Sequence, residues 1–411
     1  MDEGRHHVRA PAPLRPSASN SQKPRTRWSF NDPHVRALVY QAALIAAVAF
    51  VGWYFVSNTL RNLDERKIAT GFAFLAREAG FEIGETSGFA YGAADTYLRA
   101  LGIGLANTFR IAAVGVVLAT ILGTVLGLAR LSRNWLIARL AAVYVEVMRN
   151  IPLLVQLFFW YTIVSENLPG PKDALTLLPG LFLSNRGITF PVLHYDPAQW
   201  WLLAALLVGA VIAFLLVRWA TKRQAATGEQ FPAYSVGFGI MLGLPLLVLF
   251  AAGIPHEIHR PELSGFNFVG GAALTPEYAA LLFGLVVYTA AFIAEIVRAG
   301  VLAVDRGQFE AAHALGLPRS RAMRLVVLPQ ALRVIVPPMT SQYLNLTKNS
   351  SLAVAIGYPD LVSIANTTLN QTGQAIEGIM IIMAVYLTIS LSISAFMNWY
   401  NRRVALKGAR T

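Results

Sequence analysis

Charged side chains lie inside long apolar runs of this sequence, and their types and spacing could bind a charged group. Glu295 and Arg298 are three residues apart, so on a helix they share one face and can form an ion pair that lowers the cost of burying them. The sequence leaves two interpretations open: a pair that only locks helices together, and a pair with a functional role. Arg149 and Lys348 could each meet an anion in a low-dielectric cavity. For Arg149, extension of the side chain to the membrane surface is the alternative.

Several kinds of catalysis lack their residues in this chain. No Gly-x-x-x-x-Gly-Lys-Ser/Thr phosphate loop is present, so we expect ATP to bind elsewhere. No Gly-x-Ser-x-Gly elbow occurs, and the absence of cysteine excludes thiolate catalysis and cysteine metal sites. His256 and His259 are three apart in a loop between prolines, whereas a zinc helix spaces its histidines by four. We therefore expect neither an enzyme nor a metal site.

The composition is that of a protein of the lipid bilayer. Of the 411 residues, 55% are hydrophobic and only 14% are charged, against roughly a quarter charged in a soluble domain. The mean hydropathy is +0.51. A net charge of +12 would suggest nucleic acid for a soluble protein, but here the basic residues flank the apolar runs and indicate membrane topology instead.

Apolar run lengths predict eight membrane-spanning helices. The predicted spans are residues 37–57, 103–129, 140–164, 200–217, 234–254, 279–304, 330–357 and 376–399. With the N-terminus inside, the inner segments hold 22 of the 34 Lys and Arg residues and the outer segments hold 8. This asymmetry predicts that both termini are cytoplasmic.

The segments between the spans carry their own signals. Residues 1–36 and 400–411 are expected to be cytoplasmic tails, the first of them disordered because it is polar and rich in proline. Within 58–102, apolar residues at helical spacing predict an amphipathic helix lying on the outer membrane surface; they are Ile68, Phe72, Leu75, Ala76 and Ala79. The apolar piece from 174 to 183 is too short to span. Pro152 and Pro337-Pro338 are expected to interrupt their helices beside a cavity.

A cytoplasmic loop carries the signals of two short helices. Good helix formers fill residues 308–315, Gly316 can take the left-handed conformation that ends a helix, and Pro318 can begin the next. We expect a sharp elbow whose slim first helix lets another protein approach closely. An ordinary loop lying on the lipid headgroups is the alternative. The candidate docking residues are Gly307, Glu310, Ala311, Ala312, Gly316 and Pro318.

This loop resembles the EAA motif of ABC importer permeases, whose elbow helix sits in a groove of the ATP-hydrolysing subunit. The motif is Glu310-Ala311-Ala312 followed by Gly316. Other segments resemble the polar amino acid branch of the family: 107–108, 149–156, 295–300, 328–331 and 337–338. An extra leading span and a large insertion after the third span resemble its general L-amino acid subfamily. Ser350 stands where the family motif usually has Thr, which keeps the hydroxyl.

The resemblance implies an all-α integral membrane protein with a type I importer permease core. The five core spans would lie in 103–164 and 279–399, while the first span and a pair within 165–278 would be additions. The implied partners are an ABC ATPase dimer, a second and non-identical permease, and a periplasmic amino-acid-binding protein, all at a bacterial inner membrane. ATP and Mg would bind to the ATPase, with no cofactor in this chain and no role for nucleic acid.

The implied cargo is an L-amino acid, which brings a carboxylate and an ammonium into the membrane. Arg149 or Lys348 could meet the carboxylate, and Glu295 could meet the ammonium. The candidate pathway residues are Thr108, Arg149, Gln156, Glu295, Arg298, Asn345, Lys348, Asn349 and Ser350. A self-sufficient carrier driven by an ion gradient is the alternative. It would explain the buried charges but would leave the elbow without a purpose.

Overall fold

The computed structural model describes residues 33–65, 70–193, 199–251 and 258–404, so most of both predicted tails, Ile68 and His256 lie outside the described residues. The chain divides into two compact units, residues 1–69 and 70–411. The described part of the first unit is a single helix, α1 (Pro33–Glu65). Its apolar side chains are exposed along its length, as at Trp53, which is 65% exposed. The helix is long and apolar enough to cross a membrane, as predicted for 37–57.

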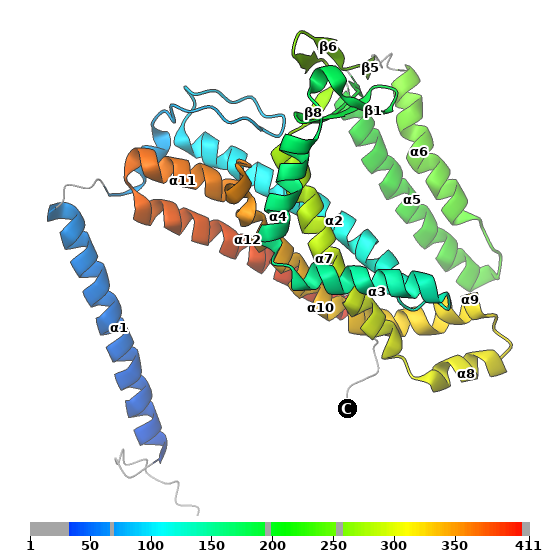
Figure 1. The fold of residues 1–411 in the computed structure, drawn as a ribbon. Coiled ribbons are helices and arrows are strands. Elements are labelled where there is room, and N and C mark those ends of the chain that lie inside the picture. The colour runs from blue at the N-terminus through cyan, green and yellow to red at the C-terminus, as the bar shows by residue number, and fades with distance from the viewer. Residues whose placement is uncertain (1–32, 66–69, 194–198, 252–257, 405–411) are drawn as a thin grey trace, which may run out of the picture. The chain divides into compact units, whose positions relative to one another are not determined.

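Two long helices form the centre of the second unit, α2 (Tyr97–Ala129) and α7 (Pro276–Leu302). Glycines let their backbones approach closely. A Cβ on Gly123 would lie 2.6 Å from the Ile293 side chain, and one on Gly127 would lie 2.7 Å from the Ala294 carbonyl oxygen. Figure 1 shows the two helices crossing at the middle of the unit. Substitution of either glycine would force the helices apart.

The third predicted span is broken. It consists of α3 (Trp135–Asn150) and α4 (Leu153–Thr162) with a π-helical turn at Ile163–Asn167, and the two halves bend by 104°. Pro152 has no N–H to donate and holds Ile151 in an extended conformation, with φ −93° and ψ 127°. The Gln156 side chain donates to the carbonyls of Met148 and Ile151, at 2.9 and 3.0 Å. The span predicted for 140–164 is therefore interrupted at Pro152, as predicted, and its first half begins earlier, at Trp135.

A second run of helices leads from the loop after α7 to the end of the unit. It runs through α8 (Arg306–Ala314), α9 (Arg319–Ala322), a π-helical turn (Met323–Val327), α10 (Leu328–Asn349) and a 3-10 turn (Ser350–Ile356). It is followed by α11 (Leu361–Thr372) and α12 (Ala375–Val404). Pro337 and Pro338 lie inside α10 without ending it, so the interruption predicted there was wrong. The irregular turn occurs instead ten or more residues earlier, at 323–327.

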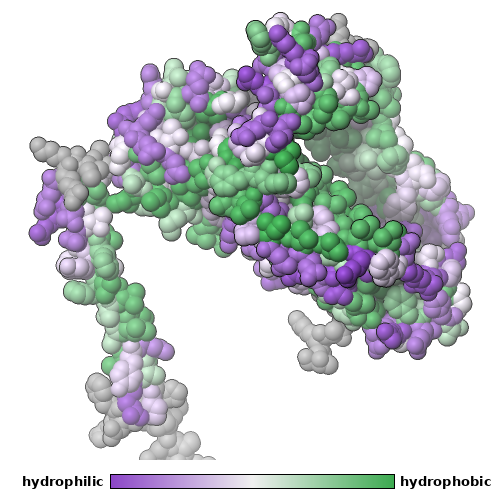
Figure 2. Space-filling view, viewed as in Figure 1, coloured by the Kyte–Doolittle hydropathy of each residue, from purple (hydrophilic) through white to green (hydrophobic). Residues whose placement is uncertain are grey.

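The insertion contains a helical hairpin, α5 (Gln199–Thr227) and α6 (Ala233–Ala251). The two helices pack chiefly against each other. A Cβ on Gly209 would lie 3.0 Å from the Met241 Cα atom, and one on Gly237 would lie 3.1 Å from the Ala213 Cβ atom. Most of the remaining hairpin surface is exposed and apolar, as Figure 2 shows.

Short strands, which the sequence analysis did not predict, cap one end of α4, α7 and the hairpin (Figure 1). One antiparallel sheet has the order β1 (Leu175–Leu178), β2 (Leu181–Ser184), β3 (Gly187–Phe190) and β8 (Ala272–Leu274). Two pairs complete the cap: β4 (Val192–Leu193) with β5 (Ile258–His259), and β6 (Glu262–Ser264) with β7 (Asn267–Val269). The apolar piece at 174–183 thus forms most of a hairpin. The strands join the two ends of the insertion, because β3 pairs with β8.

The amphipathic helix predicted within 58–102 was wrong. The described part of this segment holds only the end of α1 and a 3-10 turn at Phe72–Ala76 before α2 begins. Phe74, Ala79 and Ile83 are buried against α2 and α11 from an irregular backbone. Of the predicted stripe only Ala79 is fully buried, whereas Phe72 is 48% exposed, so the apolar spacing does not mark one buried face.

Among the described residues, seven helices are long and apolar enough to cross a membrane, and the bent pair α3–α4 makes eight if it is one span. Hydrophilic residues gather over the strands and around α8 and α9, which lie at opposite ends of α7 (Figure 2). The fold is thus a mostly helical membrane domain with a polar region at each end, one of them built from strands.

Candidate functional site

The loop after α7 folds into the predicted elbow. Asp305 caps α8 by accepting the Gly307 N–H at 3.0 Å. At the other end, Gly316 has φ +73°, its N–H donates to the His313 carbonyl at 2.9 Å, and the Leu317 N–H donates to the Ala312 carbonyl at 3.1 Å. These two bonds form a Schellman motif, which requires a left-handed residue at the glycine position. α9 then starts after Pro318, which is its N-cap residue.

The elbow presents a partly apolar and open surface. Leu315 is 80% exposed, and no atom lies within 4 Å of a Cβ placed on Gly316. Gly307, Glu310, Ala311 and Pro318 are also exposed. Ala312 alone of the six candidate docking residues is buried, at 3% exposure. A single exposed leucine is ordinary on a protein surface, so what the structure shows here is an elbow that a partner could reach without obstruction.

An ionic cluster joins α2 to α7. The Arg298 Nε and Nη2 atoms donate to Glu295 Oε1 at 3.2 and 2.5 Å, as the spacing predicted. The other carboxylate oxygen of Glu295 accepts from Arg130, the C-cap residue of α2. Glu295 thus has two guanidinium partners and ties together two helix ends near the elbow. Its predicted contact with a substrate ammonium would have to compete with both of them.

A polar cavity of about 500 Å³ lies beside this cluster. Arg149 and Glu295, which are both candidate pathway residues, line it together with Arg130, Glu146 and Phe292. The Arg149 guanidinium lies 5.2 Å from the Phe292 ring centroid, so it has a cation–π contact. The structure therefore brings an arginine and a carboxylate from α3 and α7 into one cavity, as a site for a zwitterion would need.

Polar residues form an exposed row on α10. Ser341, Asn345 and Lys348 are all exposed and recur at helical spacing, so they share one face. An exposed lysine facing lipid would be costly. This face of α10 therefore requires a wet or protein partner. Asn349 lies beside the row and is half-buried.

Three other candidate pathway residues take part in packing. The Thr108 hydroxyl donates to the Gly104 carbonyl at 2.9 Å and accepts the Leu361 N–H at 3.1 Å. The Ser350 hydroxyl donates to the Thr347 carbonyl at 2.7 Å. Thr108 and Ser350 are both 0% exposed, and Gln156 holds the α3–α4 break described above. In this structure the Thr108 and Ser350 hydroxyls and the Gln156 amide nitrogen are thus engaged in local hydrogen bonds, and a role for the three residues in a path stays a prediction.

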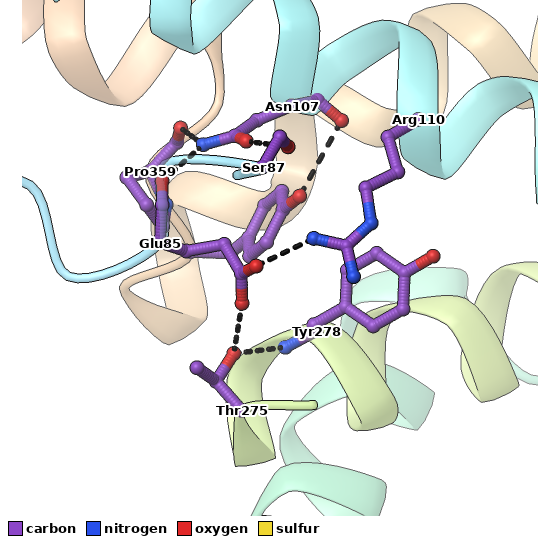
Figure 3. Close-up of polar contacts among 8 residues, drawn as sticks. Glu85, Ser87, Asn107, Arg110, Thr275, Tyr278 and Pro359 are labelled. Atoms are coloured by element: carbon purple, nitrogen blue, oxygen red, sulfur yellow. Dashed lines mark hydrogen bonds and ion pairs between the residues drawn. The ribbon is translucent and has the colours of Figure 1, made fainter. Parts of the chain in front are cut away.

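A second ionic cluster, the outer lock, was missed by the sequence analysis and is shown in Figure 3. Glu85, whose side chain is only 10% exposed, bonds to Arg110 of α2 at 2.5 Å and accepts the Thr275 hydroxyl at 3.2 Å. The Arg110 guanidinium also lies 4.3 Å from the Tyr278 ring centroid. Three chain segments thus meet at one carboxylate. We use the name outer lock for Glu85, Asn107, Arg110 and Thr275.

Asn107 completes the outer lock. Its amide nitrogen donates to the Glu85 and Pro359 carbonyls at 2.7 and 2.8 Å, and its carbonyl oxygen accepts the Ser87 hydroxyl (Figure 3). A charged Arg110 inside an apolar span was a signal that could have pointed to this site. Glu85 gave no signal, because an acidic residue in a loop is ordinary.

Asp360 lies just beyond this cluster, at the start of α11. Its carboxylate accepts the Ser363 N–H at 2.9 Å and the Tyr386 hydroxyl at 3.5 Å. Burial raises the pKa of Asp360 to about 7, because a buried carboxylate is costly in its charged form. The nearby hydrogen bonds oppose this increase without cancelling it.

Comparison with known proteins identifies the family of this chain. Residues 231–406 match the family model described as binding-protein-dependent transport system inner membrane component. A general L-amino acid transport system permease protein of Rhizobium johnstonii is 48% identical over 93% of this chain and 96% of its own length. The chain belongs to this family of transport permeases.

Two further relatives of the permease support the assignment. A putative amino-acid ABC transporter permease of Escherichia coli is 50% identical over 92% of this chain and 96% of its own length. A glutamate/glutamine/aspartate/asparagine transport system permease of Rhodobacter capsulatus is 40% identical over 92% of this chain and 95% of its own length. The permease is thus a transport component rather than an enzyme. The matches favour an ATP-driven system over the ion-driven carrier.

The family indicates what kinds of protein work with this permease. Members are inner membrane components of systems that depend on a binding protein, and an ABC system also contains an ATPase. The elbow and the polar row of α10 are both exposed in this permease. The outer lock and the Glu295 cluster lie near opposite ends of α7 and fix the helices between these surfaces.

Proposed function

We propose that this permease imports L-amino acids across a bacterial inner membrane with energy from ATP. The observation that carries the proposal is the match of more than nine-tenths of the chain to permeases named for amino acid transport. The cavity beside Arg149 and Glu295 supports it, because a free amino acid needs both a cation and a carboxylate in a low-dielectric site.

The elbow is the proposed contact with a dimer of ATPase subunits. Its exposed residues support this role, because Leu315 and the backbone at Gly316 are open to a partner. Gly307, Glu310, Ala311, Ala312 and Pro318 would shape the same surface. α8 follows directly on α7, and Glu295 ties α7 to α2. A movement of the docked elbow would therefore be transmitted to both central helices. ATP and Mg would bind to the ATPase, since this sequence has no phosphate loop.

The exposed row of α10 is the proposed wall of the translocation path. A second permease would face it, and we propose a non-identical one, as in the subfamily that the sequence resembles. Asn345 and Lys348 would then line the space between the two subunits. Arg149 would meet the substrate carboxylate at the cavity near the elbow. Glu146 lines that cavity with Arg149 and is better placed than Glu295 to meet the ammonium, because Glu295 already has two arginine partners.

The proposed orientation has both termini and the elbow in the cytoplasm. The distribution of Lys and Arg supports it, since the segment from 305 to 333 alone carries five of them. The strand cap would then face the periplasm, where a binding protein delivers amino acids.

The direct test is to purify the tagged full chain from native membranes in mild detergent and identify its partners by mass spectrometry. Recovery of an ATPase and a second permease, with ATP-dependent amino acid uptake by the reconstituted assembly, is the expected result. Recovery of the chain alone, able to carry amino acids without ATP, would overturn the proposal.

A further inference from the structure

A second polar cavity lies at the other end of α7, under the strand cap. It encloses about 720 Å³ and is lined by residues of α4, the β2–β3 turn, β7 and the start of α7. A space of this size is within the range that binds small molecules. None of the candidate pathway residues lines it, and Figure 1 shows the cap and the elbow at opposite ends of α7.

Opposite charges line this cavity without neutralising each other. Arg186 lies in the turn between β2 and β3, and Glu277 lies in the first turn of α7. Within the described part of the chain, neither residue takes part in a salt bridge. Tyr161 donates its hydroxyl to Glu277 Oε1 at 3.3 Å, which orients the carboxylate. A cation and an anion that share a cavity but do not pair are both available to a ligand.

The fold fixes the backbone of the turn that carries Arg186. β3 pairs with β8, and a Cβ on Gly187 would overlap the Leu274 carbonyl, so the turn that carries Arg186 fits closely against β8. Asn185, next to Arg186, has a buried side-chain oxygen with no hydrogen-bond partner among the described residues. A buried acceptor without a partner is costly. A ligand that reaches this oxygen and donates a hydrogen bond to it would remove this cost.

We propose that this cavity is an entry site that binds the zwitterionic backbone of a free α-amino acid. Arg186 holds the carboxylate, and Glu277 with the Asn185 oxygen accepts hydrogen bonds from the ammonium. The recognised part is common to all α-amino acids, so the site is insensitive to the amino acid side chain. The proposal rests on the proposed function for the source of the ligand.

The cavity also adjoins the outer lock. Thr275 lines the cavity, and its hydroxyl donates to Glu85 Oε2 at 3.2 Å. Glu85 in turn holds Arg110 of α2. A ligand in the entry site would therefore adjoin Thr275, which bonds to Glu85 and through it to Arg110 of α2.

The test is a binding titration of the purified full chain in lipid nanodiscs. The probes are L-glutamine, its analogue without the amino group, and its analogue without the α-carboxylate. We expect each analogue to bind about tenfold or more weakly than L-glutamine, as loss of a charged hydrogen bond implies. Arg186→Gln should weaken the binding of L-glutamine by a similar factor and leave the binding of the analogue without the α-carboxylate unchanged. Glu277→Gln should weaken the binding of L-glutamine by a similar factor and leave the binding of the analogue without the amino group unchanged.

Lys172→Gln is the matched control. Lys172 is a cation of the same cap, but it lies against the Phe266 ring at 4.2 Å and does not line the cavity, so binding should not change. No binding of L-glutamine, unchanged affinity in Arg186→Gln, or equal weakening of all three probes would overturn the entry site.

Uptake by the assembled transporter separates this proposal from the previous one. If the wild-type assembly imports amino acids with ATP, and the Arg186→Gln variant binds L-glutamine and supports uptake normally, only the entry-site proposal fails. If the wild-type chain binds L-glutamine but its assembly imports no amino acid, the entry site stands and the proposed function fails.

Discussion

Replacement of Gly316 by alanine should uncouple the permease from its ATPase without unfolding it. The residue has φ +73°, and no atom lies within 4 Å of the new Cβ. The change therefore introduces no clash, and its cost is that of a left-handed backbone, about 1–2 kcal/mol. This energy opposes the two hydrogen bonds that close the Schellman motif. The elbow conformation should become roughly 5–30-fold less populated relative to open forms of the loop.

The assay compares three variants for the ATPase that co-purifies with the chain, for ATP-driven uptake and for thermal unfolding. Gly316→Ala should lose both co-purification and uptake. Gly316→Asn should retain more of each, because asparagine adopts the left-handed conformation more readily. Gly373→Ala is the control, since Gly373 ends α11 with φ +72° and equally open surroundings. It carries the same backbone cost away from the elbow.

The reasoning fails if Gly316→Ala keeps wild-type co-purification and uptake. It also fails if Gly373→Ala uncouples transport to the same degree, because the loss would then reflect general strain.

Three further predictions concern other parts of the chain. Lys348→Ala should reduce uptake while the complex assembles normally in size-exclusion chromatography; loss of the complex would instead make Lys348 structural. Glu85→Gln should lower the stability of the chain by about 1–3 kcal/mol, because it leaves the partly buried Arg110 without its carboxylate. The exposed Glu82→Gln should have little effect in the same thermal unfolding assay, and equal effects would contradict the role of the outer lock. Asp360 should make the chain less stable as the pH rises from about 4 to about 7, because the folded state holds a proton there that the unfolded state has released. Asp360→Asn should flatten that part of the pH–stability profile, and an unchanged slope would show that another group titrates.

Local features of the fold were predictable from the sequence. The elbow depends on neighbouring residues only, since a glycine two residues before a proline ends one helix and permits the next to begin. The Glu295–Arg298 pair follows from the helical repeat. The apolar run lengths located the long helices, because the thickness of the bilayer fixes the length of a span.

Features that depend on distant parts of the chain were not predictable. Arg130 reaches Glu295 across 165 positions of sequence, and Glu85 reaches Thr275 across 190. The spacing of apolar residues in 68–79 predicted a helix, but of its described members only Ala79 is fully buried, so periodicity alone did not show which residues the other segments would cover. The prolines of α10 are tolerated because the surrounding helices stabilise it, whereas at Pro152 the chain bends by 104°.

The sequence by itself determined that this chain spans a membrane, where its long helices lie, and that one loop forms an elbow between two short helices. Each of these depends on composition or on residues a few positions apart. Only the tertiary structure decided which charges meet. It placed Arg149 with Glu295, separated Arg186 from Glu277 across one cavity, and buried Thr108 and Ser350. Such pairings depend on how helices and strands pack in space, and the helical repeat carries no information about that.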